Sequence, residues 1–135
     1  FLQRLKDSDA DNVLLFVHGF CNLPEDQAFQ RAEKLQALFN AKKRNLVEVV
    51  PVVWPCKTSD FKANKTTIES YFNDQQAADA SGYAFSRVLE RFRVWQDQSF
   101  KRITPSTATD DICLKRIHVL AHSMGNRVFR STLNI

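Results

Sequence analysis

The sequence predicts an α/β fold built on a parallel sheet that is buried on both faces. Three short runs, at 13–17, 47–53 and 117–121, are rich in Val, Ile and Leu and nearly continuous rather than alternating, which is typical of such strands. Helical patterns separate them, so the order is strand, helix, strand, helix, strand, helix. This alternation indicates right-handed crossovers and a three-layer α/β/α arrangement. We expect a single domain, because neither a repeat nor a linker interrupts the chain.

The first and third apolar runs, VLLFV and IHVLA, have the length and composition of buried strands. The second run, VEVVPVV, contains Pro51. Proline cannot donate a hydrogen bond to a neighbouring strand. We therefore expect the second strand to be bulged or split at this residue.

Apolar residues at three-to-four spacing predict helices at about 25–39 and 68–95, and a third helix begins at about 124. The second helix has a clean apolar face, formed by Phe85, Val88, Leu89, Phe92 and Trp95. We interpret its aromatic residues as core rather than as a cofactor site. Gly82 lowers the helical propensity of this stretch, which predicts either two helices or one bent helix.

Composition excludes several functional classes. The net charge is +4, but the basic clusters fall in predicted loops without a nucleic-acid-binding motif, so we predict no nucleic-acid partner. Three widely spaced cysteines form no CxxC pair, which indicates neither a zinc site nor a disulfide framework. No apolar stretch reaches the roughly 18 residues of a transmembrane helix, and no glycine-rich phosphate loop is present. We expect no cofactor and no metal; reduced thiols slightly favour the cytoplasm, and the compartment otherwise stays open.

The segment AHSMG at 121–125 carries the most chemical information. A small-x-Ser-x-Gly pattern between a buried strand and a helix is the context of a nucleophile elbow, in which a sharp turn exposes the Ser hydroxyl. Ala121 and Gly125 meet the need for small residues where the strand and the helix nearly touch. The turn would also place Ser123 at a helix N-terminus and direct the Met124 N–H toward a developing oxyanion.

A second segment supports this interpretation. His18 and Gly19 directly follow the first predicted strand, where a His-Gly loop commonly supplies the second oxyanion donor. Loops from neighbouring strand ends converge where open α/β sheets bind ligands. We therefore expect the Phe20 N–H to be the second donor, with His18 and Gly19 supporting the loop. A helix-capping role for Ser123 without catalysis is the simpler alternative.

With these motifs in place, the chain resembles α/β hydrolases, and more narrowly a lipase- or esterase-like bacterial subgroup catalogued as a domain of unknown function. The resemblance is carried by the segments 15–20, 28–32, 54–55 and 116–127 together with Tyr71, Asp74 and Ser81. It implies a partial α/β-hydrolase fold and a Ser–His–Asp triad in which the acid and the histidine follow the nucleophile. Only Ser123 has a counterpart here, so the acid and the histidine are expected beyond residue 135.

The ends of the sequence fit an incomplete domain. The chain begins with Phe1 rather than Met and stops within an apolar helical pattern. We expect residues 1–135 to be the N-terminal portion of one domain, cut after the elbow helix, with the C-terminal half missing. The intact protein is then predicted to be a serine hydrolase acting on a small-molecule acyl ester, and the fragment alone to be inactive. The alternative is a non-catalytic α/β-hydrolase-like binding or scaffold module.

None of the three histidines is a good candidate for the catalytic base. His18 is assigned to the oxyanion loop, His122 points away from its neighbour Ser123, and His118 lies too far down the strand. His118 and His122 have HxxxH spacing, but four residues of strand span about 13 Å, too far to share a metal. Asp74 is interpreted as part of a polar patch supporting the loop after 54–55, in preference to a substrate contact.

Overall fold

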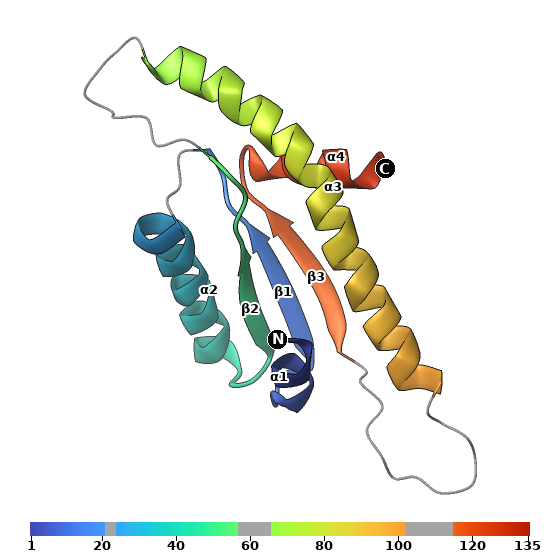
Figure 1. Cartoon of the computed structure of the whole chain (residues 1–135). Helices are drawn as coiled ribbons and strands as arrows, with labels where there is room; N and C mark the ends of the chain where they lie inside the picture. The colour runs from blue at the N-terminus through green and yellow to red at the C-terminus, as the bar shows by residue number, and fades with distance from the viewer. Residues whose placement is uncertain (21–23, 57–65, 102–114) are drawn as a thin grey trace, which may run out of the picture.

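The computed structural model describes residues 1–20, 24–56, 66–101 and 115–135. In chain order the elements are α1 (Leu2–Asp7), β1 (Asn12–Val17), the π-helical turn η1 (Pro24–Ala28), α2 (Phe29–Lys42), β2 (Val47–Val52), α3 (Thr66–Lys101), β3 (Arg116–Ala121) and α4 (Gly125–Leu133). Figure 1 shows the three strands side by side with helices around them. Within these ranges, no helix is long and apolar enough to span a membrane.

The three strands form one parallel sheet in the order β2-β1-β3. The register is level at the carboxyl edge, where Val17 lies opposite both Val52 and Ala121. β1 is the central strand, and five of its six residues are buried. The predicted α/β class and all three strand positions are therefore confirmed.

Pro51 does not break the second strand, so the expected bulge or split is wrong. β2 runs unbroken from Val47 to Val52, with Pro51 in register opposite Phe16. In the described residues β2 pairs only with β1. A strand with one partner tolerates proline, because half of its N–H groups face away from that partner.

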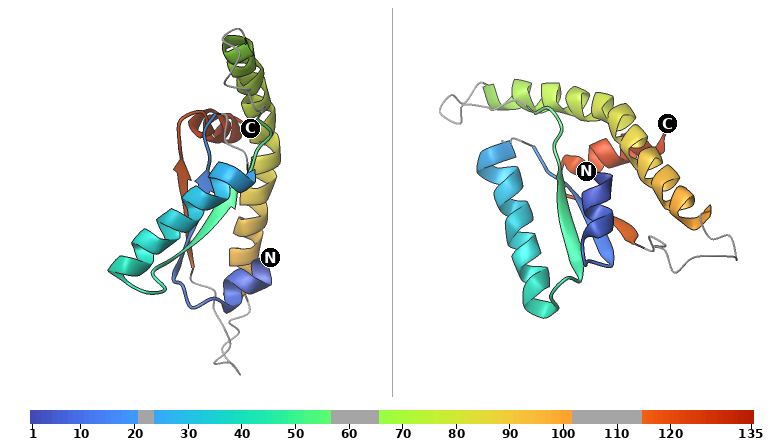
Figure 2. Two further views of the ribbon diagram at one scale, coloured as in Figure 1. Left: turned by 90° about the vertical axis from the view of Figure 1, so that its left-hand side faces the viewer. Right: turned by 60° about the horizontal axis from the view of Figure 1, so that its bottom comes forward.

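Helices cover both faces of the sheet, as the three-layer prediction requires. Figure 2 shows α2 on one side of the strands and α3 on the other. The core cluster lies between the sheet and α3, and α1 contributes to it through Leu5. Its buried members are Leu5, Val13, Leu15, Val17, Trp54, Ala78, Phe85, Phe92, Met124 and Val128. The interpretation of Phe85 and Phe92 as core residues is confirmed, and Trp95 packs against the same cluster.

The helix predictions hold in position but not in their bounds. The helix expected at 25–39 is a π-helical turn followed by α2, which continues to Lys42. α3 is one helix of 36 residues rather than two, and it bends along its length (Figure 2). α1 has no counterpart among the predicted helices, because six residues are too few to show helical periodicity.

Gly82 serves the contact between α3 and α4. A Cβ on Gly82 would lie 2.6 Å from both Cβ and Oγ of Ser131, so any other residue would push the two helices apart. The Thr132 hydroxyl donates to the Gly82 carbonyl oxygen over 3.3 Å and to the Val128 carbonyl oxygen over 2.8 Å. The glycine therefore permits a close helix crossing, and α3 continues through it.

Candidate active site

The turn between β3 and α4 (residues 121–125, the elbow) contains Ser123, the predicted nucleophile. Ser123 has φ 52°, and within the described residues only Asn45, at φ 58°, is another non-glycine residue with positive φ. Asn adopts this left-handed region readily, whereas for Ser it is strained. Such strain persists only where the surrounding structure enforces it.

Several hydrogen bonds hold the elbow in this conformation. The His122 N–H donates to the Val17 carbonyl oxygen over 2.9 Å, and the Gly125 N–H donates to the His122 carbonyl oxygen over 2.9 Å. The Asn126 side-chain amide donates to the carbonyl oxygens of Ala121 and Ser123, over 3.1 and 3.0 Å. The sequence analysis did not single out Asn126, and its only signal is an amide side chain directly after the elbow glycine.

Gly125 sits where α4 meets the end of β1. A Cβ at this position would lie 2.5 Å from the Val17 carbonyl oxygen and 2.7 Å from that of His18. These atoms are backbone and cannot rotate away, so even alanine would displace the helix from the strand. Ala121 is partly buried and packs against the core cluster.

The loop after β1 touches the elbow directly. A Cβ on Gly19 would lie 3.0 Å from Ser123 Cβ and 2.9 Å from His122 Nδ1, so the loop can approach this closely only with glycine here. The structure therefore brings the His-Gly segment and Ser123 together. Phe20 follows at once, and its ring meets that of Tyr71 edge-on at 5.4 Å.

His18 is fully buried and connects this loop to the residues after β2. Its Nδ1 lies 2.9 Å from the Gly19 carbonyl oxygen, and the Trp54 N–H donates to its Nε2 over 3.3 Å. The Trp54 indole N–H donates to the His18 carbonyl oxygen over 2.8 Å, and the two rings stack at 5.3 Å. Local sequence patterns gave no sign of this pairing across 36 residues.

These partners define the tautomer of His18. A carbonyl oxygen can only accept and a backbone N–H can only donate, so the network assigns the proton to Nδ1 and leaves Nε2 as acceptor. Burial lowers the pKa of His18, outweighing the opposing effect of its backbone hydrogen bonds. The ring is therefore neutral, and both its nitrogens are occupied away from Ser123.

The three histidines, all of them in the described residues, leave Ser123 without an imidazole partner. His18 bonds to Gly19 and Trp54, and His118 Nε2 lies 3.0 Å from Asn12 Oδ1 near the amino end of the sheet. His122 is exposed beside the elbow, and in the described chain no hydrogen bond joins it to Ser123. A histidine base for Ser123 is not found among residues 1–135.

An open depression of about 350 Å³ lies beside the exposed Ser123. Its lining residues are Tyr71, Gln75, Ser123, Met124, Asn126, Arg127 and Arg130. α3 and α4 supply most of this wall. Asp74 is 1% exposed and is not among the lining residues, and the loop after Pro55 that it was expected to support lies mostly outside the described residues.

The family model described as alpha/beta hydrolase of unknown function (DUF900) matches residues 1–134. The chain belongs to this family. Comparisons with curated proteins and with solved structures give no match. Membership in DUF900 confirms the resemblance drawn from the elbow and the His-Gly loop, and it supports a hydrolase-type activity. The three-stranded parallel sheet with its helices is consistent with part of an α/β-hydrolase fold.

Proposed function

We propose that this DUF900 domain carries the nucleophile of a serine hydrolase that cleaves carboxylic-ester or related acyl bonds. The observation that carries the proposal is the left-handed backbone of Ser123, at φ 52°, at a turn that the Gly19 loop contacts. A capping serine needs no such strain, because capping residues normally have extended φ and ψ. Strain at an exposed serine beside a depression is instead a feature of reactive sites.

Two backbone N–H groups are the proposed oxyanion donors. In the described chain the Met124 N–H donates to no other group, so it is available to a substrate oxygen. Phe20 follows Gly19, and the close approach of Gly19 to Ser123 supports the Phe20 N–H as the second donor. Donors fixed before the reaction stabilise a tetrahedral oxyanion without reorganisation, and removing one such donor costs about 10²–10³ in kcat.

The remaining residues of the site act by positioning. The neutral His18 ring holds the loop through Gly19 and Trp54, and Asn126 holds the elbow through two carbonyl oxygens. Attack forms the bond from Ser123 Oγ to the acyl carbon while the carbonyl π electrons move to the oxygen, and the Ser proton passes to a base. Collapse of the tetrahedral oxyanion then breaks the ester C–O bond, and the alcohol leaves with the proton that the base returns. Since no histidine of this chain reaches Ser123, we place the base and its acidic partner outside residues 1–135.

Fluorophosphonate labelling of the intact protein, including the segment that supplies the base, and mapping of the label by peptide mass test the proposal. We expect the label on Ser123 and its loss in Ser123→Ala. Ser86→Ala is the matched control, because within the described residues the Ser86 hydroxyl donates to the Tyr83 carbonyl oxygen of its own helix and to no other group. This variant should label normally. A folded protein without label would reduce the elbow to a structural turn and favour the binding or scaffold module.

A further inference from the structure

Two arginines on one side of α4 share the depression with Ser123. Arg127 and Arg130 are three residues apart, which puts them on neighbouring positions of a helix surface. They lie roughly 3 Å and 8 Å along the helix axis from Gly125, at 1.5 Å per residue. Among the described residues, the lining of the depression includes Arg127 and Arg130 and no Asp or Glu. Positive charge therefore faces the substrate region next to the nucleophile.

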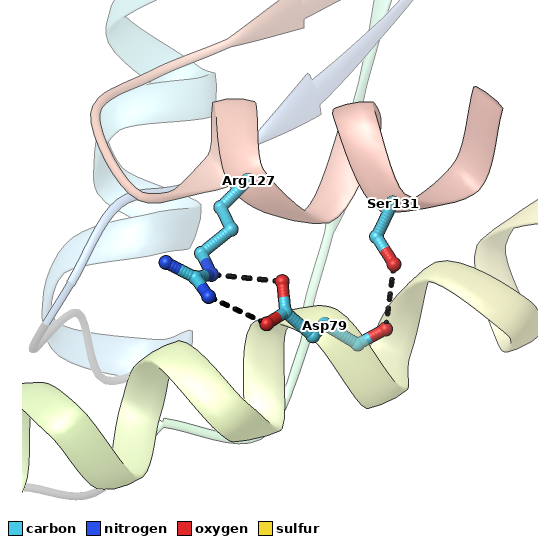
Figure 3. A network of polar contacts seen from close by, with 3 residues as sticks. All are labelled: Asp79, Arg127 and Ser131. Carbon is cyan, nitrogen blue, oxygen red and sulfur yellow. Dashed lines mark hydrogen bonds and ion pairs between the residues drawn. The ribbon is translucent and has the colours of Figure 1, made fainter. Parts of the chain in front are cut away.

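Arg127 is fixed in place by α3. Its Nε donates to Asp79 Oδ1 over 2.8 Å and its Nη2 donates to Asp79 Oδ2 over 2.7 Å, while the Ser131 hydroxyl donates to the Asp79 carbonyl oxygen over 2.8 Å. In Figure 3 the third guanidinium nitrogen points away from Asp79. A bidentate pair fixes the plane of the guanidinium group. Arg127 thus offers its remaining N–H groups in a set direction.

The pair with Asp79 persists at neutral pH. The hydrogen bond from Arg127 lowers the pKa of Asp79, and the charges of Arg127 and Arg130 lower it further. Asp79 therefore stays ionised and keeps Arg127 in place. Arg130 is exposed and, within the described residues, forms no ion pair with a carboxylate. The cluster of two cations and one anion leaves a net positive charge at the depression.

We propose that Arg127 and Arg130 bind a carboxylate carried by the ester substrate, so that the substrate class is a half-ester of a short dicarboxylic acid. This inference rests on the proposed function of Ser123. Guanidinium groups match carboxylates in geometry, and hydrogen bonds to charged groups are stronger than neutral ones. Arg127 supplies a donor held in direction by Asp79, and the exposed Arg130 supplies the second.

The test compares an anionic ester with a neutral one of similar shape. We would measure kcat/KM for mono-4-nitrophenyl glutarate and for 4-nitrophenyl pentanoate, in the intact protein that includes the base and in its Arg130→Gln and Arg127→Gln variants. The glutarate ester should be preferred, and each substitution should lower the ratio of the two kcat/KM values by about tenfold. Raising the salt concentration should also lower the ratio, because exposed charges are screened.

Arg93→Gln is the matched control, since Arg93 is an exposed arginine on α3 that does not line the depression. It should leave the ratio unchanged. Equal turnover of both esters, with a ratio that neither substitution changes, would overturn the anion subsite while leaving Ser123 as nucleophile.

If neither ester is cleaved, the proposed function fails and binding still tests the subsite. We would then titrate glutarate against the protein and follow the arginine side-chain resonances by NMR. Saturable binding that Arg130→Gln weakens about tenfold would support the subsite as a property of the fold. Absence of binding would overturn it.

Discussion

The amino ends of β1 and β3 are fastened by a buried lysine, whereas their carboxyl ends meet at a strained serine beside an open depression. At the amino end, Lys115 is 9% exposed, and its ammonium group donates to the carbonyl oxygens of Ser8 and Ala10 and to the Ser8 hydroxyl. The Arg116 N–H donates to the Asp11 carbonyl oxygen over 3.1 Å. Three acceptors thus surround one charge that has little contact with water.

The carboxyl end of the sheet differs from the amino end in its backbone strain and in its hydrogen bonding. Ser123 is held at positive φ, the Met124 N–H has no acceptor in the described chain, and Gly19 and Gly125 permit contacts that a Cβ would prevent. The Lys115 ammonium group at the amino end is satisfied within the protein, while the Met124 N–H at the carboxyl end has no acceptor in the described chain. This difference is consistent with the proposal that the carboxyl end carries the chemistry while the amino end stabilises the fold.

The largest effect on stability is expected from Lys115→Met. This change keeps the length of the side chain but removes the donor from three buried or half-buried acceptors, so the free energy of unfolding should fall by about 2–3 kcal/mol. Urea denaturation measures it, with the exposed Lys34→Met as control. Labelling of Ser123 per folded molecule should not change. Loss of labelling in the folded variant would show that the two ends are coupled.

Ser123→Gly should have the opposite effect on stability. Glycine adopts positive φ without strain but costs more entropy on folding, so the net gain is expected to be about 0.5–1 kcal/mol, with complete loss of labelling. Asn45→Gly is the matched control, because Asn45 has the same backbone conformation at φ 58° but lies far from the elbow in sequence. The free energy of unfolding should rise less in Asn45→Gly than in Ser123→Gly, and Asn45→Gly should keep the label on Ser123. A destabilised Ser123→Gly would contradict stored strain at the elbow.

The smallest change in stability is expected on acidification, and it should develop gradually with pH. The pKa of His18 is lowered from its ordinary value of 6.5, so between the folded and unfolded pKa values the unfolded chain binds more protons. The contribution of His18 to stability is full above pH 6.5 and is lost as the pH falls through that value toward the folded pKa. Urea midpoints at pH 7.5 and 5.5 should show this loss, and a smaller loss in His18→Gln. Equal losses of stability in the protein and in His18→Gln would show that groups other than His18 cause the pH dependence.

Local patterns in the sequence predicted those parts of the molecule whose causes are local. Continuous apolar runs located all three strands, and the AHSMG segment located the turn whose serine has positive φ. Gly125 was predicted to make a close contact, and the structure shows that contact to be tight. Gly19 was predicted only to support the loop, and its contact with Ser123 is also tight.

What the sequence analysis missed depends on contacts between distant segments. The His18–Trp54 pair joins residues 36 apart, and the Lys115–Ser8 contact joins residues 107 apart. No periodicity encodes such pairs, because they form only once the parallel register has brought the strand ends together. For the same reason the sequence predicts low helical propensity at Gly82 but does not predict its close contact with Ser131.

The stacking of Trp54 on His18 makes tryptophan fluorescence a reporter of the carboxyl end of the sheet. The chain has two tryptophans, so Trp95→Phe would leave Trp54 as the only indole. Its ring lies parallel to an imidazole within 10°, and a cationic imidazole at this contact would quench indole emission where a neutral one would not. The emission of Trp54 would then follow the protonation of His18 in real time, without any attached dye.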